Sequence, residues 1–504
     1  MNSLASRVAS IASAASSRTA IDDGERQVSY GEFMAEAQGV ADMLHPHGLQ
    51  RGDRVAIVLP NRIEAAVVCY GIWLAGGVAV PLDAQARTRD FVPWVEHCGA
   101  RFMVHERAHR DAELTIAELS TAALSIALED GQPICSPAHS SGGTWRDTDL
   151  TAQAKDLALI LYTSGTTGAP KGVMLSHANL LANAESVVAY LGLGPNDSVL
   201  SVLPFYYAYG ASVLHTHLIC GARIHLAKDL IFPNLIVEAI AAHRVTGFSG
   251  VSSTFALLLD HVELDNYDLS SLRYLTQAGG PMTPTLTRRL RTALPCPQLF
   301  VMYGQTEATS RLTWLPPERL DEKLGSVGIP VNGVDLKIVR EDGSTTATGE
   351  TGDVWVSGAN VMMGYWNNVE ATRAALQDGW LRTGDMGHLD ADGYLFLAGR
   401  RNDMIKTGGH RVHPNDIEEV IAELPGVIEA AVVGVDDEVM GQVIKAFVVV
   451  ETPTERGGER IKAHCRARLP PYKIPKHIEF VATLPRTASG KVRRAQLPAK
   501  QAMA

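Results

Sequence analysis

The chain has 504 residues, of which 46% are hydrophobic and 20% charged, and its net charge at pH 7 is −10. This length predicts more than one domain and a large buried core in a soluble globular protein. The negative charge argues against nucleic acid or an anionic membrane as the main partner. The six cysteines lie far apart without a Cys-x-x-Cys pair, so we expect a reduced, cytoplasmic protein without a zinc ribbon or disulfide framework.

The first 20 residues are rich in Ser, Ala and Arg and contain no acid, a composition shared with transit peptides. An amphipathic first helix is the interpretation we favour, because apolar residues recur there at helical spacing: Leu4, Val8 and Ile11. The longest uncharged run, 65–82, is interrupted by Gly76, Gly77 and Pro81. We therefore expect a helix followed by a strand in this run, and no transmembrane span.

Strand-like and helical patterns alternate from about residue 21 to 150. Residues 54–59 and 78–80 have strand character, and residues 64–75 between them have helical character. Such an alternation predicts parallel βαβ units. Residues 130–145 are rich in Gly, Ser and Pro and predict a loop.

One motif in this region points to a different chemistry. His105 and His109 match the zinc-protease pattern His-Glu-x-x-His. That chemistry needs both histidines on one face of a helix in a cleft, with a third ligand. Here the motif directly follows a predicted strand and is flanked by arginines, so we favour a solvated helix start over a zinc site.

A glycine- and hydroxyl-rich stretch, 162–173, follows an apolar run, 157–161, that we predict to be a buried strand. Glycines let backbone N–H groups turn toward a ligand, and hydroxyls and a lysine add donors, which suits polyphosphate. The stretch is not a Walker A loop. The candidate phosphate-binding residues are Thr163, Ser164, Gly165, Thr166, Thr167, Gly168 and Lys171. The alternative is a polar surface turn between a strand and a helix.

Aromatic residues gather in 203–210, after a helix that Ser176 can cap. They either pack in the core or form the wall of a pocket for an organic substrate, and the nearby phosphate loop favours the pocket. The candidate pocket residues are Tyr207, Gly210, Ser249, Gly250 and Ala278. Gly279 and Gly280 permit close approach of the backbone to a ligand.

A second polar cluster follows the apolar residues 299–302. In Tyr303-Gly304-Gln-Thr306-Glu307, the tyrosine can stack on a base, the threonine can bond a phosphate, and the glutamate can hold Mg²⁺. The alternative is a turn with an exposed acid.

The stretch 325–396 has short strands and Gly turns, which predicts a β-rich subdomain. Within it, Asp385 can accept protons from ribose hydroxyls, or else it is an Asx-turn residue. Residues 399–403 indicate a boundary. Beyond them we predict a small α+β unit with strands at 430–435 and 446–450, and with Lys491 on a loop of small residues.

Taken together and in this order, the motifs from Thr163 to Lys491 resemble the adenylate-forming superfamily of acyl-CoA synthetases, peptide-synthetase adenylation domains and luciferases. The resemblance implies an α/β fold. A large N-terminal domain (1–399) has mixed, parallel-rich sheets with helices and the β-rich subdomain, and a hinge (400–403) leads to a small mobile α+β C-terminal domain (404–504).

The resemblance also implies a two-step reaction. A carboxylate first attacks the α-phosphorus of ATP, giving acyl-AMP and pyrophosphate, and a thiol then displaces AMP. The first step brings two anions together, so charge must be neutralised at the transferring phosphorus.

By position, the resemblance implies that the nucleotide is bound by Tyr303 (adenine stacking), Asp385 (ribose), Arg400 (ribose or phosphate), Thr306 (phosphate), Glu307 (Mg²⁺) and the glycines that let it approach, Gly279, Gly280 and Gly304. It implies that Thr163, Lys171, Glu307 and Lys491 neutralise charge in the first step, with Lys491 bridging the carboxylate and the α-phosphate. For the second step it implies a pantetheine tunnel at Gly408 and Gly409, an aromatic gate at Tyr207, and a hinge at Asn402, where the family usually has Asp or Lys.

The acid and the thiol are less constrained. Amino-acid-activating members carry an aspartate for the α-amino group, and Gly210 occupies the nearest matching position, so we expect no α-amino acid. The acid is aryl, short or medium-chain. The thiol that accepts the acyl group belongs to CoA, or alternatively to a carrier protein that receives the same acid or a non-standard amino acid. Lys473 and Lys476 weakly favour CoA, because their side chains can bind its phosphates. We predict a cytoplasmic AMP-forming acid–CoA ligase using ATP and Mg²⁺; a nucleotide-binding protein without catalysis is the alternative.

Overall fold

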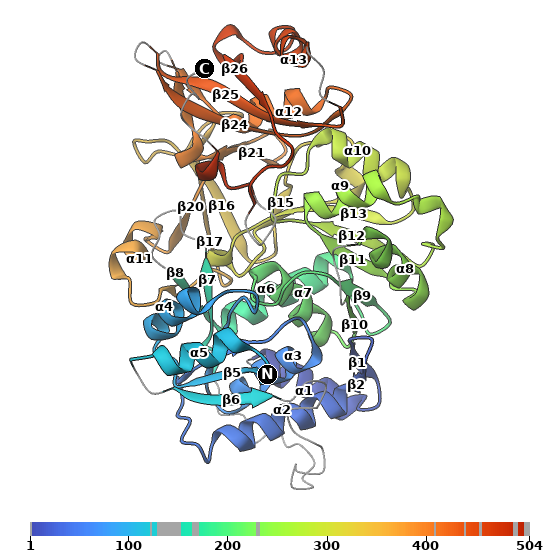
Figure 1. Cartoon of the computed structure of the whole chain (residues 1–504), viewed down its shortest axis with the longest axis vertical. Coiled ribbons are helices and arrows are strands. Elements are labelled where there is room, and N and C mark those ends of the chain that lie inside the picture. The colour runs from blue at the N-terminus through green and yellow to red at the C-terminus, as the bar shows by residue number, and fades with distance from the viewer. Residues whose placement is uncertain are drawn as a thin grey trace.

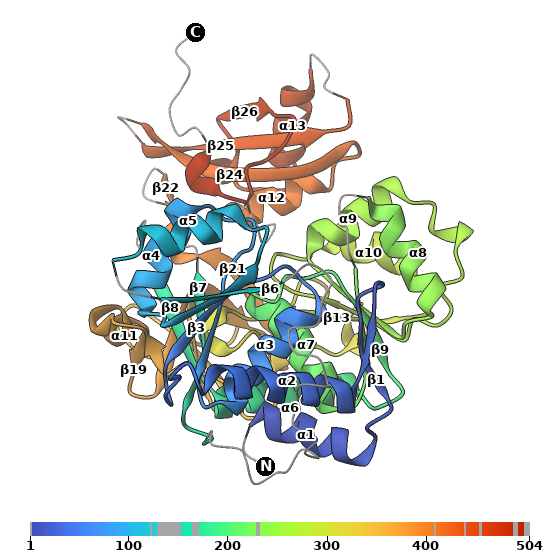
Figure 2. The same ribbon diagram turned by 60° about the horizontal axis from the view of Figure 1, so that its bottom comes forward.

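The computed structural model describes residues 3–120, 123–128, 153–163, 171–227, 232–407, 410–437, 440–452, 456–486 and 492–497, without the side chains of Asn402 and Arg411. Figure 1 shows the last part of the chain as a separate red unit above the rest, and Figure 2 shows the same arrangement from below. The three sheets built from strands up to residue 400 belong to the larger unit of the chain.

The chain begins with the amphipathic helix that we predicted. Helix α1 (Leu4–Ala14) is capped by Ser3, whose hydroxyl accepts a hydrogen bond from the Ser6 N–H. The predicted apolar face is confirmed, because Leu4 and Val8 are fully buried. Helix α2 (Tyr30–Leu44) packs beside it, capped in the same way by Ser29 with Glu32.

A seven-stranded sheet confirms the predicted βαβ units. Its order is β18-β8-β7-β4-β3-β5-β6, parallel from β7 to β6 and antiparallel at β8 and β18. The strands are β3 (Arg54–Val58), β4 (Val78–Pro81), β5 (Phe102–Glu106), β6 (Leu124–Leu128), β7 (Leu157–Thr163), β8 (Lys171–Ser176) and β18 (Gly364–Tyr365). The predicted helix between β3 and β4 is α3 (Ile63–Leu74), which is buried along its whole length. Helices α4 (Thr88–Cys98) and α5 (Arg110–Glu118) complete these units.

A nine-stranded sheet forms the second layer, in the order β15-β14-β13-β12-β11-β9-β10-β1-β2. Its middle, from β13 to β1, is parallel, and the edge strands are antiparallel. The strands are β1 (Thr19–Asp22), β2 (Gln27–Ser29), β9 (Ser198–Ser201), β10 (Arg223–Leu226), β11 (Gly247–Gly250), β12 (Tyr274–Gln277), β13 (Gln298–Tyr303), β14 (Thr313–Leu315) and β15 (Ile329–Pro330). Helices α8 (Pro233–His243), α9 (Ser252–His261) and α10 (Pro284–Ala293) follow β10, β11 and β12.

Two helices lie between these sheets, as Figure 1 shows: α6 (His177–Leu191) and α7 (Ala208–Ile219). Ser176 caps α6 as we predicted, accepting from the Asn179 N–H while the Asn179 side chain accepts from the Ser176 N–H. Leu159 and Leu161 are buried beside these helices and join a continuous apolar core. The core therefore runs through both sheets and fixes them as one body.

The remaining strands form two smaller sheets, which confirm the predicted β-rich subdomain and the small α+β unit. The first is β16-β17-β20-β19 with β21 on β20, and the second is β23-β22-β25-β24 with β26 on β25. Their bounds are β16 (Val334–Val339), β17 (Gly352–Gly358), β19 (Leu376–Gln377), β20 (Trp380–Leu389), β21 (Leu395–Arg400), β22 (Ile405–Thr407), β23 (His410–Val412), β24 (Val427–Asp437), β25 (Gly441–Val450) and β26 (His477–Phe480). The helices are α11 (Val369–Ala375), α12 (Pro414–Ala422) and α13 (Gly457–Arg466).

Within the described ranges, no helix is long and apolar enough to cross a membrane. The uncharged run at 65–82 is split between α3 and β4, as the glycines and the proline predicted.

Candidate functional site

Three of the predicted nucleotide-binding side chains meet at the junction of the nine-stranded sheet and the β-rich subdomain. The Tyr303 hydroxyl, at the end of β13, donates to Asp385 Oδ2 at 2.6 Å. Arg400 Nε pairs with Asp385 Oδ1 at 3.1 Å, and the two residues face each other across β20 and β21. The charge of Asp385 raises the pKa of Arg400, and burial, with Asp385 beside it, raises the pKa of the Tyr303 hydroxyl. The cluster thus has one carboxylate held by two donors.

Asp385 lies inside strand β20, so the alternative interpretation as an Asx-turn residue is wrong. The preceding residue, Gly384, has a φ of +77° and gives the strand its local irregularity. The Asp385 N–H donates to the Thr383 hydroxyl at 3.1 Å. The carboxylate is therefore fixed by the backbone as well as by its partners.

A second polar cluster surrounds Glu307, which lies in a 3₁₀ turn (Thr306–Ala308) directly after β13. The Tyr365 hydroxyl donates to Glu307 Oε1 at 2.8 Å. Lys171 Nζ lies 5.8 Å from the centre of the Tyr365 ring, because β18 pairs with β8. A carboxylate oxygen is a preferred ligand of Mg²⁺, and within the described part of the chain Glu307 forms no ion pair that would compete for it, so this residue fits the predicted metal role.

The glycine- and hydroxyl-rich stretch joins two strands, not a strand and a helix. Thr163 at the end of β7 faces Lys171 at the start of β8 in an antiparallel pair. The alternative interpretation is therefore wrong in its geometry, and α6 follows only after β8. Residues Ser164, Gly165, Thr166, Thr167 and Gly168 lie outside the described residues. Of the two strand ends that flank this stretch, Lys171 lies over the ring of Tyr365, which holds Glu307.

Gly304 has a steric reason to be glycine. A Cβ at this position would lie 1.8 Å from the Ser310 carbonyl oxygen, because the chain turns back on itself and the Leu312 N–H donates to the Tyr303 carbonyl. Gly279, after β12, has a φ of +86°, which an L side chain rarely adopts. Both glycines therefore permit the tight turns that bring β12 and β13 to the site.

The predicted pocket residues lie in two places. Ser249 and Gly250 end β11, and Ala278 follows β12, so they stand beside Tyr303 at the carboxyl edge of a parallel sheet. This edge is where open α/β sheets bind ligands. Tyr207 is the N-cap residue of α7 and is half-buried. Gly210 faces the backbone instead, since a Cβ there would lie 2.1 Å from the Pro204 carbonyl oxygen.

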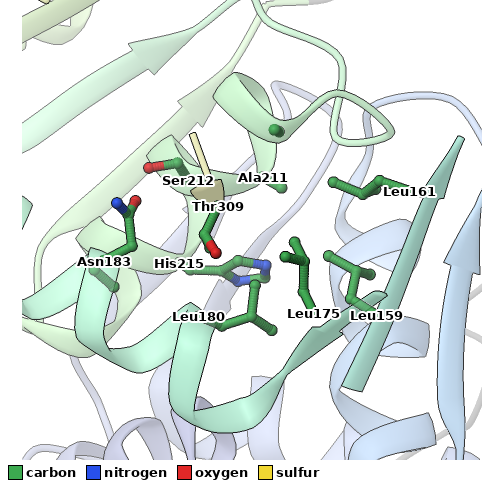
Figure 3. A pocket seen from close by; sticks show the side chains of 11 residues that line it. Leu159, Leu161, Leu175, Leu180, Asn183, Ala211, Ser212, His215 and Thr309 are labelled. Carbon is green, nitrogen blue, oxygen red and sulfur yellow. The ribbon is translucent and has the colours of Figure 1, made fainter. Parts of the chain in front are cut away.

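Two small cavities among the described residues lie near α7, and the five predicted pocket residues line neither of them. The first, shown in Figure 3, lies between α6, α7 and β7–β8 and has a volume of about 10 Å³, roughly the space of one water. The second, about 30 Å³, lies between α3, α7 and the aromatic stretch, and Phe205 and Tyr206 line it. Both are too small for an organic acid.

The last part of the chain approaches the aromatic stretch. Burial and then the charge of Asp83 raise the pKa of the Tyr207 hydroxyl to about 12, whereas the nearby charge of Arg493 lowers it. Lys491, two residues earlier, and Gly408 and Gly409 lie outside the described residues.

The two lysines considered for CoA phosphates already have acidic partners. Lys473 Nζ pairs with Asp416, and Lys476 Nζ with Asp437 Oδ2 at 2.9 Å. Either lysine would have to leave its carboxylate in order to bind a phosphate.

The zinc-protease pattern has no zinc-protease geometry. His105 lies in strand β5 and is fully buried, with Nε2 2.7 Å from the Ser125 hydroxyl, whereas His109 is the N-cap of α5. Our expectation of a solvated helix start was wrong for His105, because the strand continues to Glu106.

Elsewhere, the described residues contain one group of three side chains of metal-ligand type, formed by Asp22, His225 and His243. Arg223 donates to Asp22 Oδ2 at 2.8 Å and supplies the positive charge there. We interpret this cluster as an ion-pair network.

Sequence reasoning missed two residues of this region. Tyr365 holds Glu307 from a strand 58 positions away. Arg311 is buried against Tyr209, with its guanidinium carbon 4.1 Å from the ring centre. Neither belongs to a motif, although an arginine four residues after a predicted metal ligand was a signal that could have been followed.

Comparisons with known proteins agree with this geometry. The family model described as AMP-binding enzyme matches residues 9–366, and the model of the AMP-binding enzyme C-terminal domain matches residues 416–491. The chain is 32% identical to a long-chain-fatty-acid–CoA ligase of Bacillus subtilis (strain 168), with 95% of this chain and 91% of the relative covered. It is 34% identical to a feruloyl-CoA synthase of an Amycolatopsis species, with 95% of each chain covered.

A solved structure supports the same assignment. The o-succinylbenzoate coenzyme A synthetase of Bacillus subtilis, in complex with ATP and magnesium ion, superimposes with a TM-score of 0.84 at 31% identity, covering 97% of this chain and 98% of that one. The match of both family models and of the whole fold extends over nearly the entire sequence. The chain therefore belongs to the adenylate-forming superfamily of AMP-binding enzymes, and is of the acid–CoA ligase type.

Proposed function

We propose that this chain activates a carboxylic acid with ATP, releasing pyrophosphate, and transfers the acyl group from AMP to the thiol of CoA. The observation that carries the proposal is the convergence of Lys171, Glu307, Asp385 and Arg400, with Tyr303, from four separate segments of the chain. This set offers a ribose acceptor, cationic groups and one carboxylate oxygen for a metal.

The first step joins two anions, so its rate depends on positive charge near the α-phosphate. Lys171 lies over the ring of Tyr365, which holds Glu307, and the charges of Asp385 and Glu307 act on Arg400. Mg²⁺, held by Glu307, would neutralise phosphate charge when ATP is bound. We assign Lys491 to the acid and the α-phosphate, with Thr163, Thr306 and the residues 164–168 contacting phosphates.

The second step needs a different arrangement of the small C-terminal unit, and the contacts around Asn402 support a hinge there. Arg401 pairs backward with Asp353 Oδ2 at 2.7 Å and Glu341 Oε1 at 2.9 Å, in or next to the β-rich subdomain. Asp403 pairs forward with Arg494 Nη1 at 3.4 Å. Each neighbour of Asn402 is thus tied to a different unit, which supports our division at 1–399, 400–403 and 404–504.

The relatives support CoA over a carrier protein as the thiol, because they are CoA ligases by name. With the small unit rotated, Gly408 and Gly409 would line the tunnel to Tyr207. The five cysteines of the described residues are all unpaired, which supports a reducing compartment such as the cytoplasm. The named acids of the relatives differ widely, so the acid of this chain depends on its own pocket.

The test separates the two steps. Lys491→Ala should lose most pyrophosphate release, about 100-fold or more by removal of a charge at the transition state, while ATP affinity measured by calorimetry changes little. Wild-type protein should form an acyl-CoA in the presence of acid, ATP, Mg²⁺ and CoA. Pyrophosphate release unchanged in Lys491→Ala would contradict the role of Lys491, and acyl transfer to a carrier protein but not to CoA would contradict the acceptor.

A further inference from the structure

Arg311 is a buried cation without an acidic partner. Only 2% of the residue is exposed, and its Nε makes no hydrogen bond. Among the described residues, no carboxylate forms an ion pair with it within 4.0 Å. Nη1 donates to the hydroxyl of the adjacent Ser310, and the guanidinium also interacts with the hydroxyl of Tyr190. A guanidinium has five N–H donors, so these two neutral oxygens leave part of its capacity, including the Nε–H, unused.

Arg273 shows how a partly buried arginine is compensated elsewhere in the same fold. Arg273 also lies over a tyrosine ring, that of Tyr274, at 4.9 Å. Its guanidinium pairs with Asp197 at 2.9 Å and donates to the Leu191 carbonyl at 2.9 Å. Arg273 is thus a structural arginine with its charge compensated, whereas Arg311 is more deeply buried and contacts the ring face of Tyr209 and the neutral hydroxyls of Ser310 and Tyr190.

Arg311 is connected through Tyr209 and Thr276 to a residue that we predicted for the acyl pocket. Its guanidinium lies over the ring of Tyr209, whose hydroxyl is 2.9 Å from the Thr276 hydroxyl, which in turn donates to Ser249 at 2.8 Å. Ser249 is one of the residues that we predicted for the acyl pocket. Arg311 therefore stands on the wall formed by α7, β11 and β12.

The nucleotide site is next to this wall. A Cβ at Gly304 would lie 2.9 Å from the Arg311 Cα, so Arg311 touches the residue that follows Tyr303. Thr309 and Ser310 have φ values of 57° and 106°, which turn the chain back to place Arg311 there. Such conformations are costly for residues other than glycine and are found where the surroundings enforce them. An acid whose reacting carboxylate is near the α-phosphate can thus extend toward Arg311.

A buried charge without a partner is strongly unfavourable, and a carboxylate would satisfy a guanidinium with paired N–H···O bonds. We propose that Arg311 binds a second carboxylate of the acid substrate, so that the enzyme activates one carboxyl group of a dicarboxylic acid and retains the other. This inference rests on the proposed function and names its substrate class.

The experiment measures kcat/KM for pyrophosphate release with pairs of acids in which a carboxylate replaces the terminal methyl group. Suitable pairs are butyrate and succinate, hexanoate and adipate, and 4-methylbenzoate and terephthalate. We expect the diacid of at least one pair to exceed its partner by about 10- to 100-fold, the range for a hydrogen-bonded charged group. Preference for the monoacid in every pair that reacts would overturn the inference and leave the proposed function standing. No release with any acid would overturn both.

Variants separate a binding role from a structural one. Arg311→Met should lower kcat/KM for the diacid by about 10- to 100-fold and leave or raise that for the monoacid. Arg311→Lys should recover part of the loss, because it keeps the charge without the planar pair of donors. Arg273→Met is the matched control and should leave the ratio of diacid to monoacid unchanged. An equal loss for both acids in Arg311→Met would overturn the inference. If that variant does not fold, the wild-type pairs decide alone.

Discussion

Replacement of Asp385 by asparagine tests the nucleotide site most directly, because it keeps the shape of the side chain and removes its charge. The carboxylate side chain is 10% exposed, and its two oxygens bond Tyr303 and Arg400 at 2.6 and 3.1 Å. Hydrogen bonds to charged groups contribute about 1.5–3 kcal/mol each, roughly twice as much as neutral ones. If each of the two hydrogen bonds from the ribose hydroxyls loses half of its contribution when Asn replaces Asp, the binding free energy of ATP falls by about 1.5–3 kcal/mol in total. The Kd of ATP should therefore rise about 10- to 150-fold.

Isothermal titration calorimetry with Mg²⁺ and ATP measures this change, and thermal unfolding shows whether the variant remains folded. Asp390→Asn is the matched control: Asp390 follows the same strand β20 and accepts a hydrogen bond from Lys323 Nζ at 2.8 Å, away from the site. It should leave the Kd of ATP unchanged. A folded Asp385→Asn variant with the wild-type Kd, or an equal loss in the control, would refute the assignment of Asp385 to the ribose.

Three further predictions concern the second step, the hinge and the pH dependence of stability. Gly409→Leu should lower acyl transfer to CoA at least tenfold more than pyrophosphate release, because the side chain fills the tunnel; equal losses in the two assays would argue against a separate thiolation arrangement. Asn402→Pro should preserve a first burst of pyrophosphate and slow steady-state acyl-CoA formation, since proline fixes φ at the hinge, and normal turnover would show that the pivot lies elsewhere. Burial lowers the pKa of His215 to about 3 and that of His177 to about 4, so the unfolded chain binds protons below about pH 6.5 that the folded chain does not. Stability should be complete above pH 6.5 and fall by up to about 1.4 kcal/mol per pH unit for each histidine as the pH decreases toward 4; a melting temperature that does not change between pH 7 and 5, or a slope that His215→Gln does not reduce, would contradict this.

Local rules were sufficient for the elements. Ser176 before an apolar-periodic run predicted the start of α6, and the apolar residues 157–161 predicted β7, because capping and burial act within a few residues. The same rules misjudged His105, whose place depends on β6 pairing beside β5. They also left open whether Asp385 was a ribose-binding residue or an Asx-turn residue, since the preceding Gly384 is typical of a turn and yet lies within β20.

What the sequence alone determined is the set of chemical groups: the hydroxyl- and glycine-rich stretch, Tyr303 with Glu307, Asp385, Arg400, and the order in which they occur. Their types and spacing along the chain were enough for the superfamily and for the reaction class. Only the tertiary structure decided that Tyr365 holds Glu307, that Gly210 packs against a backbone carbonyl, and that Arg311 is buried without an ion pair to any carboxylate of the described residues. These facts depend on contacts between segments far apart in the chain and on which groups surround a buried side chain. The residues adjacent in sequence do not determine either of these.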